Sequence, residues 1–93
     1  MATPQRRHAV AAIRNIRGLH ARASAKIVEA AARFQSHITV TKDGQTVDAR
    51  SIMGLMMLAA ALNSEIEVDV EGPDAEEAMT AILALIEAKF GED

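Results

Sequence analysis

The chain has 93 residues, no cysteine, two aromatic residues and a net charge of −3. This length suits one small domain, residues 1–93, with a core of aliphatic side chains, methionine and alanine. The composition excludes disulfides and thiolate chemistry, and an acidic chain with so little aromatic stacking surface disfavours nucleic-acid binding.

The first elements are one strand and one helix. A weak alternation of alanine and isoleucine predicts a strand over residues 8–15, and we expect residues 1–7 to form a flexible N-terminal extension. Apolar residues recur at helical spacing over residues 21–34 without a proline, so a helix is predicted there.

A hairpin is predicted next. Residues 37–42 and 45–50 both alternate apolar and polar side chains. Asp43-Gly44 lies between them, and both residues tolerate the positive φ of a tight hairpin turn.

A short helix and then a strand are predicted after the hairpin. Ser51 is a preferred helix N-cap, and a short helix is predicted from it to residue 58 or 59. Residues 65–71 alternate valine or isoleucine with acids, as in a strand with one buried face.

The final element is a helix that we expect to run from Asp74 to about Phe90. Asp74 and Glu77 have the spacing of an acidic capping box. The order β-α-β-β-α-β-α predicts an α+β fold, a two-layer open-faced sandwich. In it a four-stranded antiparallel sheet is covered on one face by three helices.

Charge is distributed unevenly along the chain. Residues 1–50 hold nine Lys and Arg against three acids, whereas residues 51–93 hold one Lys and ten acids. The basic half contains His20 with several arginines nearby, which suits an anionic ligand or an acidic partner surface.

His20 stands on a glycine-led turn where the first helix is predicted to begin. Unpaired N–H groups and the helix dipole favour a phosphate at such a position. A neutral imidazole there is placed to accept a phosphoryl group, and Arg22 adds a cation that can fork onto its oxygens. A lone histidine would more often be a helix cap or an idle surface residue, but the surrounding glycine and arginine favour the chemical role.

Two motifs carry a resemblance to a known family. Gly18-Leu19-His20-Ala21-Arg22 resembles the active-site motif of HPr, the histidine-containing phosphocarrier of the bacterial phosphotransferase system. Arg50-Ser51-Ile52-Met53-Gly54-Leu55-Met56 resembles the regulatory serine motif of the same family. The resemblance extends over roughly residues 8–90 and includes the order of the elements.

The resemblance implies a role for individual residues. His20 matches the histidine phosphorylated on Nδ1, and Arg22 matches the arginine that neutralises the phosphohistidine. The N–H groups of Ala21 and Arg22 lie where the phosphate docks in this family. Ser51 matches the serine that a dedicated HPr kinase/phosphorylase modifies.

A docking surface is also implied. The short helix has too many apolar residues to bury them all, so Leu55 and Leu58 are assigned to the core. The surplus matches the family's partner-docking patch, which we assign to Arg17, Ile52, Met53 and Met56.

The implied function is that of a stoichiometric carrier, not an enzyme. It would take phosphate from phosphoenolpyruvate through enzyme I and pass it to an EIIA-type domain. We expect a cytoplasmic monomer that binds no cofactor and makes no contact with membrane or nucleic acid. Magnesium would serve the enzyme I step and not this chain.

Two other functions compete with this one. A regulatory protein-binding module would act mainly through Ser51 and the short-helix surface. A hydrolase or metal enzyme is poorly supported, because no second base accompanies the motif and His8 and His37 lack ligand spacing.

The chain departs from the usual family pattern just after the active-site arginine. Ala23 replaces the usual proline, which favours a nitrogen-type regulatory branch, and Ser24 is placed to offer a hydroxyl near the phosphate.

Overall fold

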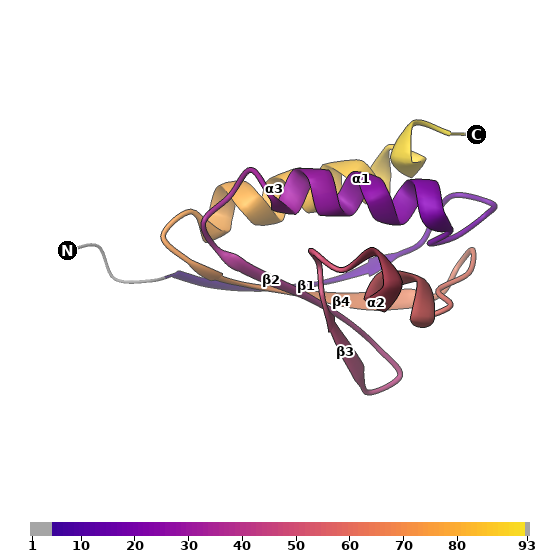
Figure 1. Cartoon of the computed structure of the whole chain (residues 1–93), viewed down its shortest axis with the longest axis horizontal. Coiled ribbons are helices and arrows are strands. Elements are labelled where there is room, and N and C mark those ends of the chain that lie inside the picture. The colour runs from indigo at the N-terminus through magenta and orange to yellow at the C-terminus, as the bar shows by residue number, and fades with distance from the viewer. Residues whose placement is uncertain (1–4, 93) are drawn as a thin grey trace.

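Residues 5–92 are described by the computed structural model, and their four strands form one antiparallel sheet (Figure 1). The strands are β1 (Gln5–Ala12), β2 (His37–Lys42), β3 (Gln45–Asp48) and β4 (Glu65–Gly72). Their spatial order is β1-β4-β2-β3, so β1 pairs with a strand from the far half of the chain.

Three helices complete the fold, namely α1 (Ala21–Ala31), α2 (Ile52–Met57) and α3 (Ala75–Glu87). Helices α1 and α3 lie side by side over one face of the sheet, and α2 contacts α1 and β3 (Figure 1). The predicted fold class is confirmed.

The core lies between the sheet and the helices. Alternate residues of β4 point toward it, as the alternation of apolar and acidic residues predicts. Its largest side chains are those of Ile13, Ile27, Leu55, Ile66, Ile82, Ile86 and Phe90.

The hairpin and the central strands agree with their predictions. Asp43 and Gly44 have φ values of 51° and 79°, as a tight primed turn requires. Val40 and Val47 face each other across the hairpin. Strand β3 ends at Asp48 and not at residue 50, because the Asp48 carboxylate accepts the Arg50 N–H at 2.8 Å and turns the chain.

The predicted bounds of the first strand, 8–15, were wrong. Strand β1 begins at Gln5, so residues 5–7 belong to the sheet and not to an extension, and residues 1–4 lie outside the described residues. The start is fixed by pairing, since Gln5 lies opposite Gly72. The strand ends at Ala12, after which Ile13 exchanges hydrogen bonds with Asn63 and Ser64.

Helix α1 ends at Ala31 and not at residue 34. Arg33 and Phe34 each donate to the carbonyl three residues earlier, so the last turn tightens before β2. Helix α2 ends at Met57, and Leu58 and Ala59 follow in the same tightened way.

The predicted capping box between Asp74 and Glu77 does not form. Asp74 occupies the N-cap position of α3, but its side chain makes no capping hydrogen bond. Its carboxylate instead accepts the N–H groups of Gln35 and Ser36, because those donors come from the neighbouring loop in suitable geometry.

Helix α3 ends at Glu87, three residues before the predicted end at Phe90. Lys89, Phe90 and Gly91 all have positive φ, which turns the chain sharply and buries the Phe90 ring. The turn directs Glu92 back over the molecule toward α1.

Candidate functional site

His20 occupies the N-cap position of α1, as the sequence predicts. Its backbone is extended, with φ −71° and ψ 178°, and its side chain makes no capping hydrogen bond. The imidazole is therefore not used to cap the helix. The N–H groups of the first turn, including those of Ala21 and Arg22, have no partner within the helix.

The loop before His20 is fixed by backbone contacts. Leu19 donates to the carbonyl of Ala60 at 2.9 Å, which ties the loop to the segment after α2. Gly18 has φ +66°, and a Cβ there would lie 2.3 Å from the Ala60 oxygen. Only glycine fits this close approach, so Gly18 helps to set the position of His20.

A carboxylate contacts the His20 ring. Nε2 of His20 lies 2.8 Å from Oε2 and 3.1 Å from Oε1 of Glu92. Both side chains are largely shielded, with 20% and 19% of their surfaces exposed. Sequence reasoning missed Glu92, because it lies 72 residues away and only the tertiary fold brings it close.

Asn15 holds that carboxylate. Its Nδ2 donates to Glu92 Oε1 at 2.8 Å and to the Gly18 carbonyl at 2.8 Å, and the residue is fully buried. Its Oδ1 has no partner among residues 5–92. Hydrogen bonds from Asn15 and then His20 hold the pKa of the Glu92 carboxyl below its ordinary value, so Glu92 is anionic near neutral pH.

The C-terminal turn places Glu92 over the start of α1. The buried Phe90 ring anchors this turn, and Lys26 of α1 donates to the Phe90 carbonyl. The one available sequence signal was Phe90-Gly91, an apolar anchor followed by a helix-ending glycine.

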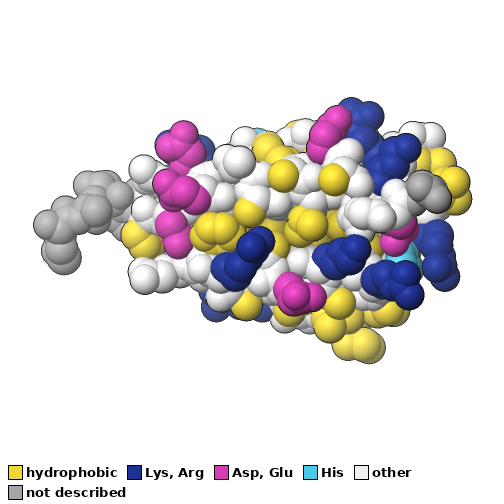
Figure 2. Space-filling view, turned by 90° about the horizontal axis from the view of Figure 1, so that it is seen from above, with side chains coloured by type: hydrophobic (Ala, Val, Ile, Leu, Met, Phe, Trp, Pro, Cys, Tyr) yellow, Lys and Arg dark blue, Asp and Glu magenta, His cyan; other side chains and the backbone are white. Residues whose placement is uncertain are grey.

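The arginines predicted for the site lie around His20 and are exposed. Arg22 is in the first turn of α1, two residues after His20, and Arg17 is in the loop before it. The positive charge of Arg17 also contributes to the lowered pKa of Glu92. In the view of Figure 2, blue Lys and Arg side chains gather at the C-terminal end of the molecule, around a histidine and an acid.

Two residues after the arginine are buried. Ala23, which stands where the family usually has proline, is completely covered. Ser24 was expected to present a hydroxyl near the phosphate, and this expectation is corrected. The buried Ser24 Oγ donates to the Leu19 carbonyl at 3.1 Å, because that acceptor lies one turn back in the loop.

The fold brings the two sequence motifs together. A hollow of about 270 Å³ is lined by Arg17, Leu19 and His20 on one side and by Met56 and residues 59–61 on the other. Ser51 caps α2 as predicted, and its Oγ accepts the Gly54 N–H at 2.9 Å.

The apolar residues of α2 divide into buried and exposed sets. Leu55 and Leu58 are buried, as predicted. Ile52 and Met56 are about two-fifths exposed and Met53 is 69% exposed. Met57, at 65%, and Ile16, at 71%, extend the exposed apolar surface and were missed by the sequence reasoning.

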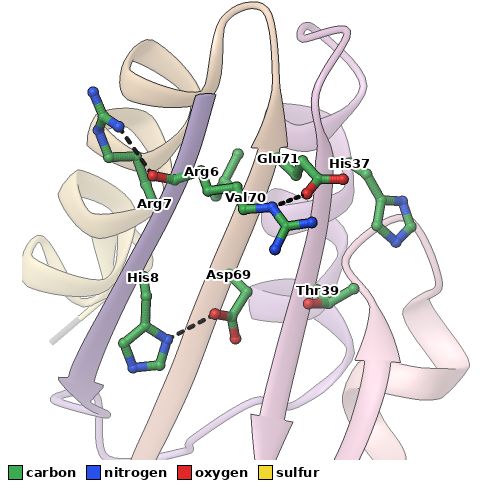
Figure 3. A pocket seen from close by; sticks show the side chains of 8 residues that line it. All are labelled: Arg6, Arg7, His8, His37, Thr39, Asp69, Val70 and Glu71. Atoms are coloured by element: carbon green, nitrogen blue, oxygen red, sulfur yellow. Dashed lines mark hydrogen bonds and ion pairs between the residues drawn. The ribbon is translucent and has the colours of Figure 1, made fainter. Parts of the chain in front are cut away.

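A second hollow, of about 420 Å³, lies on the uncovered face of the sheet (Figure 3). Two of its basic residues are paired with acids of the sheet, since Arg6 contacts Glu71 and His8 donates to Asp69 at 2.7 Å, whereas Arg7 donates to the Arg6 carbonyl at 2.9 Å. The Asp69 hydrogen bond raises the pKa of His8. His37 is exposed on the same face.

The described part of the chain contains neither a membrane-spanning helix nor a cluster of metal-ligating side chains. Over residues 5–92, no helix combines the length and apolarity needed to cross a bilayer. In the same range, no three His, Asp or Glu side chains cluster in a way that would hold a metal ion.

A small open-faced sandwich with an uncapped histidine at a helix start and exposed arginines beside it has the geometry that a phosphoryl carrier needs. The family described as "PTS HPr component phosphorylation site" matches residues 8–88. The chain belongs to this family, and it functions as a phosphocarrier of the phosphotransferase system and not as a catalytic enzyme.

Individual relatives agree with this assignment. The chain is 53% identical over 75 residues to the phosphocarrier protein HPr of Cupriavidus necator, covering 81% of this chain and 84% of that protein. It is 51% identical over 70 residues to the HPr-like protein Crh of Halalkalibacterium halodurans, covering 75% and 83%. The crystal structure of HPr-C-His from Thermoanaerobacter tengcongensis superposes with a TM-score of 0.89 at 44% identity, covering 94% of this chain and 98% of that one.

Proposed function

We propose that His20 accepts the phosphoryl group on Nδ1 from phosphorylated enzyme I and passes it to an EIIA-type domain. The observation that carries this proposal is the free side of the ring. Nε2 is bound to Glu92, whereas Nδ1 has no hydrogen-bond partner among residues 5–92. The Nδ1 lone pair is the nucleophile available for phosphoryl transfer.

The surroundings of His20 supply the charge stabilisation that such a transfer needs. The protein contributes mainly positioning and neutralisation of the phosphoryl oxygens. The N–H groups of Ala21 and Arg22 provide donors at the positive end of the helix dipole. Arg22 is exposed in the same turn and adds a cation able to bind two oxygens.

Partners would dock on the surface formed by Arg17, Ile52, Met53 and Met56, to which Met57 and Ile16 add apolar area. Methionines adapt to different partner surfaces. Arg17 and Met56 line the same hollow as His20, so a partner bound there covers the reacting histidine. The basic surroundings favour a partner with an acidic surface. We propose that the carrier acts as a monomer in the cytoplasm, with no bound cofactor.

The position of Ser51 supports a second, regulatory function. Its half-buried hydroxyl lies at the start of α2, beside the exposed side chains of Ile52 and Met53. Phosphorylation by an HPr kinase would place negative charge against the docking surface and weaken binding of an acidic partner. In the alternative function, this surface would act as a regulatory binding module.

The test is an intact-mass assay with phosphoenolpyruvate, magnesium and enzyme I. We expect one acid-labile phosphate on the wild type and none on His20→Ala. If the wild type gains no phosphate from an enzyme I of the same source, the carrier mechanism at His20 is wrong and the Ser51 surface becomes the leading explanation.

A further inference from the structure

The carboxylate on the His20 ring is built into the fold. Glu92 is held from one side by Asn15 and meets Nε2 of His20 on the other. Both donors come from the segment between β1 and α1, while the turn that carries Glu92 is anchored by the buried Phe90 ring. Such an arrangement gives the carboxylate one defined position.

We propose that Glu92, held by Asn15, is a positioning residue that keeps the His20 proton on Nε2 and balances the positive charge that the ring gains when Nδ1 is phosphorylated. This inference rests on the proposed function of His20.

The proton position follows from donor and acceptor chemistry. An ionised carboxylate only accepts hydrogen bonds, so the imidazole nitrogen facing it must carry the proton. In the neutral ring the other nitrogen, Nδ1, then keeps its lone pair. Glu92 therefore selects the tautomer in which the proposed nucleophile is ready to react.

The orientation of the Asn15 amide is also determined. Nδ2 donates to two oxygens, Glu92 Oε1 and the Gly18 carbonyl. A flipped amide would place Oδ1 against both acceptors, which is repulsive. The present orientation leaves Oδ1 unpaired among the described residues, at a cost in stability. Asn15 therefore has one favoured amide orientation, the one in which Nδ2 holds Glu92.

With Glu92 in place, the transfer step accounts for the electron pair, the proton and the charge of the ring. The Nδ1 lone pair forms the bond to phosphorus while the bond from phosphorus to the donor atom breaks and its electron pair leaves with the donor. The proton stays on Nε2, so the ring becomes a cation, which the Glu92 carboxylate neutralises at 2.8 Å. Onward transfer reverses these changes, and the ring returns to its neutral form with the proton still on Nε2.

Glu92→Gln tests this role sharply. The carbonyl of the new side-chain amide would take the place of Oε1, which Asn15 Nδ2 binds, so the amide NH₂ group would replace Oε2, the oxygen nearer to His20 Nε2, at 2.8 Å against 3.1 Å for Oε1. An amide NH₂ only donates, and it would therefore favour the tautomer with the proton on Nδ1. Glu92→Ala removes the carboxylate without offering a donor, so its effect should be smaller. If Glu92 had a merely structural role, Glu92→Ala would have the larger effect, because glutamine keeps the shape of the side chain.

Two measurements report the outcome. Nitrogen-15 NMR of the His20 ring at mildly alkaline pH reports the tautomer. Intact mass with enzyme I and phosphoenolpyruvate reports the phosphorylation rate. Glu87→Gln is the matched control. It removes one acid from the same end of the chain, where Glu87 is exposed and contacts only Arg14 among its ion-pair partners in residues 5–92.

We expect the wild type and Glu87→Gln to hold the proton on Nε2 and to react at rates within about twofold, since exposed ion pairs contribute little. Glu92→Gln should shift the proton toward Nδ1 and slow phosphorylation by about tenfold or more, since a carboxylate-to-amide change beside a catalytic histidine has large effects through the tautomer. Wild-type tautomer and rate in Glu92→Gln, or equal losses in Glu92→Gln and Glu92→Ala with the tautomer unchanged, would overturn the role of Glu92. Phosphate on His20→Ala would instead overturn the proposed function.

Discussion

Ser36 and Asp74 bind each other reciprocally across the junction between β2 and α3. The Ser36 N–H donates to Asp74 Oδ1 at 2.9 Å and its hydroxyl donates to the same oxygen, while the Asp74 N–H donates back to Ser36 Oγ at 3.3 Å. Gln35 supplies a further N–H to Oδ2 at 3.0 Å. The carboxylate thus joins the start of one strand to the start of a distant helix.

This contact predicts an acid-sensitive contribution to stability. The Ser36 hydroxyl and the Gln35 N–H hold the pKa of Asp74 below its ordinary value. A lowered folded-state pKa stabilises the fold at pH values above the unfolded pKa of about 3.9, and this stabilisation is lost as pH falls through the folded value. Asp74→Asn should therefore be less stable than the wild type at neutral pH, and the difference should narrow in acid.

Urea unfolding of both proteins at neutral pH and at a series of acid values measures this. Glu77→Gln is the control, because the capping box with Asp74 does not form, and its free energy of unfolding should stay within about 0.5 kcal/mol of wild type at neutral pH. A constant difference between Asp74→Asn and wild type at all pH values would contradict the assignment.

Gly18→Ala should destabilise the protein and displace the active loop. A Cβ at Gly18 would meet the Ala60 oxygen at 2.3 Å, whereas a Cβ at Gly44, also at positive φ, would meet nothing within 4 Å. We expect Gly44→Ala to lose about 1 kcal/mol from backbone conformation alone and Gly18→Ala to lose about 2 kcal/mol or more. Urea unfolding gives the two free energies, and equal losses would show that the contact with Ala60 is unimportant.

Substitutions of Met53 and Leu55, which lie close together in α2, should have opposite effects, one on docking and the other on stability. Met53→Asp alters an exposed side chain, so the free energy of unfolding should stay within about 0.5 kcal/mol of wild type. The KM of enzyme I for this carrier should rise. Leu55→Ala empties a fully buried site and should lose about 2–5 kcal/mol of stability. Phosphorylation kinetics on protein shown to be folded separate the two effects. An unchanged KM in Met53→Asp would argue against docking at this residue.

Substitutions at Ser51 separate its capping role from the proposed regulatory one. Ser51→Ala loses the hydrogen bond from the Gly54 N–H and should cost about 1 kcal/mol. Ser51→Asp keeps a capping oxygen, so its stability should lie within about 0.5 kcal/mol of wild type, since Asp and Ser rank alike as caps. Its added charge should slow phosphate transfer to the acceptor. Transfer at the wild-type rate in Ser51→Asp would remove the argument for regulation by charge.

The sequence predicted those parts of the fold whose signals are local. The alternation over residues 65–71 and the Asp43-Gly44 turn match the observed elements. The start of β1 could not be predicted, because its first residues are polar and are ordered by pairing with β4. The donors that bind Asp74 likewise come from a loop 38 and 39 residues away, so the nearby Glu77 was a misleading partner.

The candidate site likewise contains residues that the sequence predicted and residues that only the tertiary fold brings to the site. The His20 and Ser51 motifs are contiguous, and the structure places both at helix starts, as predicted. Glu92 and Asn15 carry no local signal for a role at His20, since their proximity depends on how α3 ends and where Phe90 is buried. Met57 was missed because its exposure depends on which face of α2 packs against α1 and β3.

The position of Glu92 has a practical consequence for producing the protein. Because the Glu92 side chain contacts the His20 ring, an affinity tag fused to this end of the chain would follow closely on a residue that contacts the reacting histidine, and it would compete with docking partners. Strand β1 begins at the opposite end of the molecule (Figure 1). A tag at the N-terminal end joins the chain through β1, away from His20, so assays of this carrier are best made with that arrangement.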